Sequence, residues 1–419
     1  MGAYKRNHYV PRWYQNLFFQ GDEKEKKFYY LDLKPNKIKT PNGTTFTRNS
    51  LLRWGPSRCF CQKDLYTTRF LSFESTEIEQ YFFGKIDREG KKAVKYFSDF
   101  QHPSANHEAF QSIIIYLSTQ KLRTPKGIAY LESIFNKADK NIILFKLQEL
   151  HRMHCAIWTE CVWSIVDASE SQIKFICTDH PVTVYNKACF PHSKWCRGAN
   201  DPPIWLNGSH TIFPLSFDKA LILTNLSWAR NPYGNPIESR PHAKLFREAI
   251  FNFTAIQTGR KLNENEVNAI NYILKSRAYR FIASTQKDWL YPEAIDRKLR
   301  WDKLGDSYLL MPDPRSMTFS SEIIIGYKGG RADAFDEYGR KPWHNDFNDK
   351  SRHEYEWHTF HAFQGEYARL FGPKRRGVSF EFGRIGSEED DLDFHHYHLR
   401  LEQEHKQYVR RRKKKRKRR

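Results

Sequence analysis

The sequence predicts an α+β fold, in which a central helical block and an antiparallel sheet occupy separate stretches of the chain. Apolar residues recur at helical spacing between about residues 74 and 153, whereas period-two patterns and short apolar runs fill about 162–224. Helical spacing returns after residue 241. Because helices and strands are segregated and do not alternate, the pattern disfavours a doubly wound parallel sheet.

The first 70 residues are typical of short strands and turns. The stretch 28–33 is aromatic and β-prone, and Pro35-Asn36 closes it with a turn. A block of three helices should follow, because apolar stripes at helical spacing continue from there. The middle helix should end before Thr124-Pro125. We expect these helices over about 74–97, 109–117 and 128–153.

Two hairpins are expected in the middle of the chain. The first would join 162–166 to 173–177, and the second would join 211–215 to 220–224 across a short polar turn. A later helix should begin near residue 264. Asn263 and Glu266 have the spacing of a capping box, in which each side chain bonds the other residue's backbone N–H.

A chain of 419 residues is long for a single core, so two domains are the starting expectation. We expect an α+β domain over 1–300 and an irregular C-terminal extension of unknown role over 301–409. Only two pieces of the extension are expected to be ordered, one near 322–327 and one near 354–371. Aromatic residues make up 15% of the chain, which is enough apolar matter for a stiff core.

The formal net charge is +21, and it is unevenly distributed. Residues 410–419 are all Lys or Arg and account for +10, so the other 409 residues carry 21 − 10 = +11. Ten adjacent cations cannot pack together, which predicts a solvated and disordered tail. Such a tail favours a polyanion, with RNA or DNA ahead of a membrane surface. Arg411, Lys413 and Arg416 represent its expected contacts to substrate.

Several classes of protein are disfavoured by what the sequence lacks. It contains no run of 18 apolar residues and no signal-like apolar N-terminus, so we expect no membrane span and a cytoplasmic location, or a nuclear one in a eukaryote. The odd number of cysteines, seven, favours reduced thiols. Phosphate loops, glycine fingerprints, HExxH motifs and nucleophile elbows are missing, which argues against nucleotide hydrolysis and nicotinamide chemistry.

Five blocks in order carry a resemblance to a known family. They are His8-Tyr9-Val10-Pro11 followed by the aromatic pair Trp13-Tyr14, the stretch 118–125, the stretch 178–182, Pro214-Leu215-Ser216 with 220–223, and 267–271 continuing through Ala278, Arg280 and Phe281. Together they resemble the HYVP-motif family, known as domain of unknown function 4238, over roughly residues 4–284. The chain has His180 where Asn is commoner in that family, and Phe217 where Pro is commoner. The first departure adds a titratable group.

Asp179 and His180 follow a predicted strand, where a rigid element can aim functional groups. Pro181 keeps His180 out of the helical conformation. Asp beside His could bind a metal or supply an acid–base pair near neutral pH. The structural alternative is an Asp that caps a turn and a Pro that ends a strand.

A phosphate-binding group can be assembled from His8, Arg12 and Arg123. If a helix begins after Pro11, its free backbone N–H groups would favour an anion near His8 and Arg12. Arg123 could bind phosphate in a bidentate manner while His8 donates a proton. Alternatively, Arg123 bonds only the carbonyls at a helix end and His8 bonds only backbone.

Metal sites can be drawn from several patterns. Glu74 and Glu79, placed near the head of the first long helix, could join Asp179 around a divalent metal, although acidic residues also simply favour a helix N-terminus. Cysteine and histidine groups also recur, but without the usual zinc spacing, so structural thiols and solvated imidazoles are the alternative. They are Cys189, His192 and Cys196, with further histidines at 353, 358, 361, 395, 396 and 398.

Two functions follow from these patterns. The first is a phosphodiesterase, of nuclease type, built from His8, Arg123, Asp179 and His180 and delivered to RNA or DNA by the tail. Such an activity would suit a bacterial anti-phage defence or toxin effector, as the diversity of the family implies. The second is a non-catalytic nucleic-acid-binding module, in which the same polar blocks are structural. Convergence of His8, Arg123 and Asp179 on one cleft would favour the first.

Overall fold

The structure is a computed structural model of the whole chain. The residues that it describes are 6–21, 26–40, 42, 45–63, 65, 68–70, 73–75, 84–100, 107–134, 140–241, 256–306, 308–319, 323–326, 329–372, 400, 404, 407 and 411. The fold is of the α+β class, as predicted. Helices and sheets occupy largely separate stretches, and the sheets are antiparallel or mixed.

The helices vary from one turn to six. The α-helices are α1 (Arg12–Gln15), α2 (Gly84–Ser98), α3 (His107–Leu122), α4 (Pro125–Ile134), α5 (Lys140–Thr159), α6 (Leu226–Arg230), α7 (Glu264–Arg277), α8 (Pro292–Ile295) and α9 (Lys350–Phe371). Short 3₁₀ helices cover Asn16–Phe18, Lys194–Cys196, Asp288–Leu290, Trp301–Lys303 and Pro314–Ser316.

The strands are short. They are β1 (Arg6–His8), β2 (Phe28–Asp32), β3 (Lys37–Lys39), β4 (Thr45–Thr47), β5 (Leu51–Trp54), β6 (Cys61–Lys63), β7 (Thr68–Phe70), β8 (Phe73–Ser75), β9 (Cys161–Asp167), β10 (Cys177–Thr178), β11 (Thr183–Tyr185), β12 (His210–Pro214), β13 (Lys219–Asn225), β14 (Ile256–Lys261), β15 (Phe281–Ser284), β16 (Ile323–Gly326) and β17 (Ala332–Phe335).

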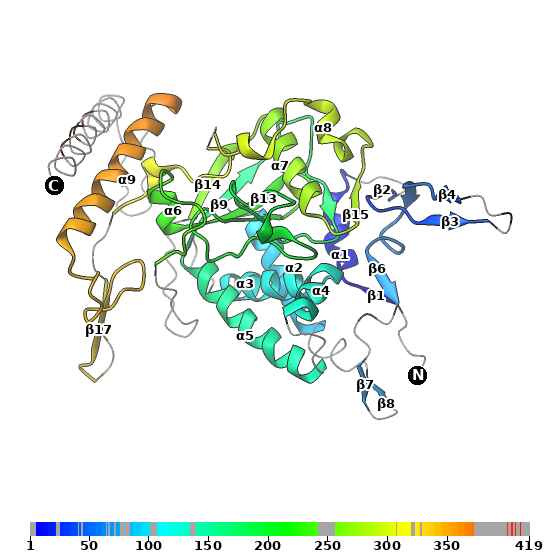
Figure 1. The fold of residues 1–419 in the computed structure, drawn as a ribbon, viewed down its shortest axis with the longest axis horizontal. Helices are drawn as coiled ribbons and strands as arrows, with labels where there is room; N and C mark the ends of the chain where they lie inside the picture. Colours follow the sequence, from blue (N-terminus) through cyan, green and yellow to red (C-terminus); the bar gives the residue numbers. More distant parts are fainter. Residues whose placement is uncertain are drawn as a thin grey trace.

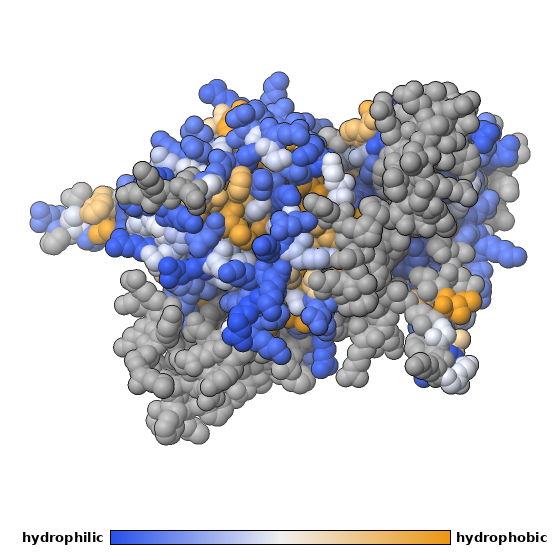
Figure 2. All heavy atoms as spheres, turned by 180° about the vertical axis from the view of Figure 1, so that it is seen from behind, coloured by the Kyte–Doolittle hydropathy of each residue, from blue (hydrophilic) through white to orange (hydrophobic). Residues whose placement is uncertain are grey.

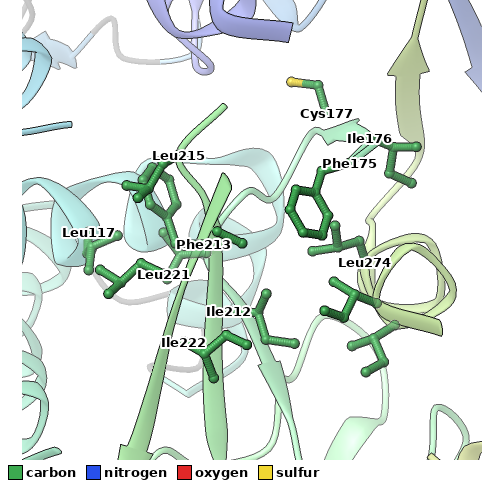
Figure 3. Close-up of a cluster of buried hydrophobic side chains, with 14 of the residues drawn as sticks. Leu117, Phe175, Ile176, Cys177, Ile212, Phe213, Leu215, Leu221, Ile222 and Leu274 are labelled. Atoms are coloured by element: carbon green, nitrogen blue, oxygen red, sulfur yellow. The ribbon is translucent and has the colours of Figure 1, made fainter. Parts of the chain in front are cut away.

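A five-stranded sheet forms the centre, in the order β11-β12-β13-β9-β14. Its pairs are antiparallel except for β14, which runs parallel to β9. In β12 and β13 almost every residue is buried, so both faces of the sheet are covered. Figure 3 shows how: Phe213 and Leu221 lie next to Leu117 of α3, while Ile212 lies on the side of Leu274 from α7.

Helices cover this sheet from both sides (Figure 1). The block of α3, α4 and α5 lies on one side and α7 on the other. A second sheet, in the order β10-β15-β2-β5, lies beside the first and is antiparallel throughout. The β3–β4 hairpin extends outward from the body, as Figure 1 shows.

Several predicted elements are confirmed. The strand at 28–33 is β2, the hairpin at 211–224 is β12–β13, and the helix at 109–117 is part of α3. Asn263 and Glu266 form the predicted capping box at the start of α7, with both reciprocal bonds present. The two ordered pieces expected in the C-terminal extension correspond to β16 and α9.

The predicted hairpin of 162–166 with 173–177 is wrong. The first stretch is β9, but its two neighbours are β13 and β14, which come much later in the chain. Most of the second stretch makes no strand, because its backbone bonds other groups: Phe175 N–H donates to the Phe217 carbonyl and Ile176 N–H to Asn271 Oδ1. Only its end, in β10, pairs, and its partner is β15.

The helical block also differs from the prediction. Glu74 lies in β8, opposite Arg69 of β7, so it is not at the head of a helix; α2 begins at Gly84. Aromatic and β-branched residues at 68–75 favour this hairpin over a helix. The helix predicted at 128–153 is described as two helices, α4 and α5, with residues 135–139 outside the described part of the chain.

The boundary predicted at residue 300 stays a prediction, as does the division into domains. Trp301, Leu304, Leu309 and Leu310 pack into the same hydrophobic core as the sheets. A separate small cluster joins α6 to α9 through Trp228, Met311, Phe363 and Tyr367. The beginning of the predicted extension is therefore packed against the body.

Candidate functional site

The side chain of His180 lies in a buried polar cluster. It follows β10, is 2% exposed, and faces the start of α4 and the loop that contains Asp201. Thr124 Oγ1 is 2.9 Å from its Nδ1, and Asp201 Oδ2 is 2.8 Å from its Nε2. An ionised carboxylate only accepts, so in the neutral ring Nε2 carries the proton and Nδ1 accepts from Thr124. Both ring nitrogens are therefore occupied.

Two lysines share the carboxylate of Asp201. Lys121 Nζ lies 2.5 Å from Oδ2, and Lys126 Nζ lies 2.5 Å from Oδ1. Lys126 also donates to the carbonyl of Arg277 at 2.7 Å. All three charged side chains of this trio are buried. One carboxylate thus faces two ammonium groups, which leaves the cluster with an excess of positive charge when both are protonated.

The charges in this cluster shift the pKa values of its members. Burial alone would raise the pKa of Asp201, but the ammonium groups of Lys121 and Lys126 hold it well below its usual value. Burial lowers the pKa of His180 to about 4, against the attraction of Asp201. Burial also lowers the pKa of Lys126. At neutral pH the imidazole is therefore uncharged and the carboxylate is ionised.

The cluster borders a small pocket. Lys121, Lys126, His180 and Asp201 line it together with His154. Its volume is about 30 Å³, which is room for roughly one or two water molecules. His154 Nδ1 is 3.4 Å from Ser118 Oγ, and burial lowers the pKa of this imidazole to about 3. A nucleotide does not fit in this space unless the loop with Asp201 moves.

Asp179 points away from the cluster, toward β15. Its carboxylate accepts the backbone N–H groups of Tyr279, Arg280 and Phe281 at 2.8, 2.6 and 2.7 Å. Its own backbone N–H donates to the Phe281 carbonyl at 3.0 Å. The side chain is 1% exposed, and burial raises its pKa, against the three N–H donors. This geometry favours a structural role, in which Asp179 joins β10 to the start of β15.

Arg123 is also occupied within the fold. Its Nε and Nη2 both donate to Gln120 Oε1, at 2.8 and 2.5 Å, and its Nη2 is 2.8 Å from Asp87 of α2. Gln120 Nε2 in turn donates to the Tyr9 carbonyl at 2.8 Å. The guanidinium is buried. It links α3 to α2 and, through Gln120, to the N-terminal segment.

His8 and Arg12 lie in the N-terminal segment. His8 ends β1 and is paired in register with Cys61 of β6. Arg12 is exposed at the first residue of α1, a helix of only four residues. Of the four residues predicted to be catalytic, the structure places His180 in the charged cluster. Asp179 and Arg123 lie in separate hydrogen-bond networks.

Hydrogen bonds do connect the five sequence blocks. The Tyr14 hydroxyl donates to the Pro214 carbonyl at 2.6 Å, which joins the first block to the fourth. Gln120 joins the second block to the first, and Thr124 joins it to His180 of the third. Asp179 joins the third block to the last. Residues far apart in the sequence thus form one buried frame.

A family model matches residues 6–288, which is about two thirds of the chain. The chain belongs to the family DUF4238. That family is described as proteins of unknown function, so membership assigns no chemistry. No curated protein and no solved structure matches the chain. No described helix is long and apolar enough to cross a membrane.

Most of the remaining predicted site residues of this DUF4238 protein are not among those that the structure describes. Glu79, Lys413 and Arg416 are not among the described residues, and Arg411 is exposed. In the described part of the chain, no group of three His, Cys, Asp or Glu side chains could hold a metal ion. A divalent metal therefore stays a prediction.

The zinc pattern at 189–196 does not form a site. Cys189 and Cys196 are buried against Leu206, whereas His192 is exposed. All seven cysteines are free. His353, His358 and His361 lie on α9, and His395, His396 and His398 are outside the described residues.

Sequence reasoning missed most of the charged cluster in the DUF4238 region. Lys121 and Thr124 lie inside the second block and Lys126 follows it directly, so the block itself was the available signal. No local sequence pattern marks His154 or Asp201 as a site residue. Asp201 lies in a loop without a motif, 80 residues from Lys121 and 75 from Lys126.

Proposed function

We propose that this protein binds nucleic acid through its polybasic C-terminal segment, and that the polar blocks of the DUF4238 region hold the fold. The ten consecutive cations at 410–419 carry this proposal. Lysine and arginine next to a nucleic acid displace the counterions condensed on its phosphates, which gives affinity without sequence preference. The body adds a further net charge of +11, from 21 − 10.

The β3–β4 hairpin supports the same function. Its strands are exposed along their whole length and carry Lys37 and Lys39. Ile38 and Phe46 pair across it and are 41% and 49% exposed. A projecting two-stranded ribbon with cations and an exposed ring can enter a groove or stack on a base. Figure 2 shows hydrophilic residues over most of the described surface in that view, with apolar residues in smaller groups.

The structural half of the proposal follows from the buried frame. Asp179 is saturated by backbone donors and Arg123 by Gln120 and Asp87. A catalytic carboxylate or phosphate-binding guanidinium needs an open path to substrate, and both side chains are buried in the fold.

The tail is tested by anisotropy with a labelled 20-mer duplex and a labelled single-stranded RNA over a range of salt concentrations. If about six cations of the tail neutralise phosphates, the log–log slope on duplex should be about −5. Replacing residues 410–419 by ten Gln should abolish most of the affinity and flatten the slope. The melting temperature should not change. Binding that survives the replacement with the same slope would refute the role of the tail.

A phosphodiesterase centred on His180 is the second candidate, and the excess of ammonium groups around Asp201 favours it. Lys121 and Lys126 could offset phosphate charge if the loop with Asp201 moved aside. In that case the protein would be a nuclease-type effector, as in bacterial defence. His180→Asn separates the two candidates, since Asn is the commoner family residue and should fold. Cleavage of RNA or DNA by the wild type across a panel of metals, lost in this variant, would establish the enzyme.

A further inference from the structure

A second pocket lies where α6 meets residues 304–306 and 308–311. Its volume is about 260 Å³, which is close to the lower end of the range for small-molecule sites. The rings of Tyr185, Trp228, Tyr233 and Tyr308 line it, together with His210. Residues 304–306 and 308–311 follow the part of the chain matched by the family model, so this pocket is built partly from residues outside the DUF4238 region.

Two of its aromatic walls are held in place by α9. The hydroxyl groups of Tyr233 and Tyr308 both bond the carboxylate of Glu366, the latter at 2.7 Å. Tyr308 has a φ of 55°, a backbone conformation that residues other than glycine rarely adopt. Such conformations concentrate at ligand sites, where the surrounding structure enforces them. Fixed rings offer a flat surface on which a planar ligand can stack.

His210 supplies a hydrogen-bonding ring nitrogen to the pocket. Its Nδ1 is 2.9 Å from Thr224 Oγ1, and the Thr224 hydroxyl is 3.3 Å from the Leu310 carbonyl. When the hydroxyl donates to that carbonyl, Nδ1 donates to Thr224 and Nε2 is an acceptor; when the hydroxyl donates to Nδ1, Nε2 carries the proton and is a donor. Nε2 makes no hydrogen bond to any described residue, although His210 is only 4% exposed. A ligand with both N–H donors and ring-nitrogen acceptors would satisfy it in either tautomer.

Lys187 supplies a positive charge at the rim. Its ammonium group lies 5.4 Å from the centre of the Trp228 ring and makes no ion pair with a described residue. Asp306, the acidic residue of the rim, is 3.3 Å from Lys303. Aromatic walls, a buried ring nitrogen and a rim cation without an ion pair to a described residue are the groups that recognise a base, its polar edge and its phosphate.

We propose that this pocket binds one nucleobase carrying a phosphate, which extends the nucleic-acid binding proposed above. The base stacks among Trp228 and Tyr308 and forms a hydrogen bond with His210 Nε2, while its phosphate meets Lys187. The ligand has two possible sources, a free mononucleotide or an unpaired base in a bound strand. Their recognition chemistry is the same.

Calorimetric titration with adenosine 5′-monophosphate tests the site, with ribose 5-phosphate as the probe that lacks a base. We expect the nucleotide to bind at least about tenfold more tightly than the sugar phosphate, because stacking and the His210 bond require the base. Lys187→Met should weaken nucleotide binding by about tenfold. Lys194→Met is the matched control, since Lys194 also lies over a tryptophan ring, Trp195, at 5.2 Å but outside the pocket. It should bind as the wild type does.

A filling substitution at Gly305 gives an independent test. A Cβ at this position would meet Lys187 Cδ at 3.5 Å, an ordinary contact, and its φ is not positive. Gly305→Ala should therefore keep the wild-type melting temperature, and Gly305→Phe should occupy the pocket and abolish nucleotide binding. If Gly305→Phe has a lowered melting temperature, nucleotide binding by Lys187→Met still tests the proposal. Equal binding of nucleotide and sugar phosphate, or no binding of either, overturns the proposal.

The two sources are separated with a duplex that has one bulged adenine and a fully paired duplex of the same length. A preference of the wild type for the bulged duplex, lost in Gly305→Phe, supports a base in a strand. Nucleotide binding without that preference supports a free mononucleotide. If the nucleotide fails to bind while the duplex still binds through the tail, the pocket proposal is refuted and the proposed function stands. Nucleotide binding without any duplex binding would refute the proposed function and leave the pocket proposal standing.

Discussion

Polar groups in the buried frame of the DUF4238 region have hydrogen-bond partners, whereas two polar groups in the pocket beside α6 lack partners among the described residues. In the frame, Asp179 has three backbone donors and His180 has a partner at each nitrogen. In the pocket, His210 Nε2 and the Lys187 ammonium have no such partners among the described residues. Saturated polar groups specify a fold, whereas unsaturated ones beside a cavity are available to a ligand. The two regions should therefore respond differently to substitution.

The largest effect is expected for Asp179→Ala. Removing the carboxylate leaves the part-buried N–H groups of Tyr279, Arg280 and Phe281 without their acceptor. The free energy of unfolding should fall by about 3–5 kcal/mol. Urea denaturation measures it. The control is Asp302→Ala, which removes an exposed carboxylate and should change stability by less than about 0.5 kcal/mol. A stable Asp179→Ala protein would mean that the carboxylate does not hold the frame together.

Asp201→Asn should have the next largest effect, because it removes the carboxylate that Lys121 and Lys126 share. We expect a loss of about 3 kcal/mol from two buried ammonium groups without a counter-charge. Adding Lys121→Met to this variant should restore part of the loss, and a double-mutant cycle on urea curves measures the coupling. Independent, additive effects would show that the cluster is not electrostatically linked.

Local features of the fold could be predicted from the sequence. The β12–β13 hairpin has its turn within four residues, and the capping box of α7 lies within the residues that it caps. The wrong hairpin at 162–177 shows the limit. The true neighbours of β9 lie about 60 and 90 residues further along the chain, so no local pattern identifies them.

The candidate site shows the same limit. His180 was found because a strand end and Pro181 mark it. Asp201 was missed, because a loop aspartate without a motif gains its meaning only from lysines brought to it by folding. The sequence also indicated Asp179, but as a catalytic residue. Its three backbone partners come from a strand that the sequence does not connect to it.

The dependence of stability on pH should distinguish His180 from an ordinary exposed imidazole. Its pKa falls from 6.5 to about 4 on folding, because burial disfavours the charged ring. The unfolded chain therefore binds more protons between these values, so the stabilisation is complete above pH 6.5 and is lost as pH falls toward 4. At pH 5 this one imidazole should lower the free energy of unfolding by about 2 kcal/mol relative to its value above pH 6.5.

His180→Asn provides the control for that measurement. Thermal melts between pH 7.5 and 4.5 should show a smaller acid-induced loss in this variant than in the wild type, by about 2 kcal/mol at pH 5. A residual loss should remain, because burial also lowers the pKa of His154 and His210 to about 3. If the wild type and the variant lose stability in parallel, His180 is not buried as a neutral ring.

The smallest effect is expected for Lys187→Met, and it sharpens the comparison most. Lys187 is exposed at the pocket rim without an ion pair to a described residue, so its loss should change the free energy of unfolding by less than about 0.5 kcal/mol. Lys126→Met is the contrasting substitution. It removes the bonds of Lys126 to Asp201 and to the Arg277 carbonyl, and should lower the free energy of unfolding several times more than Lys187→Met does. Urea curves of the two variants, measured side by side, test whether a lysine at the rim is free for a ligand while one in the frame is not. Equal losses would mean that the pocket is as much a part of the fold as the frame is.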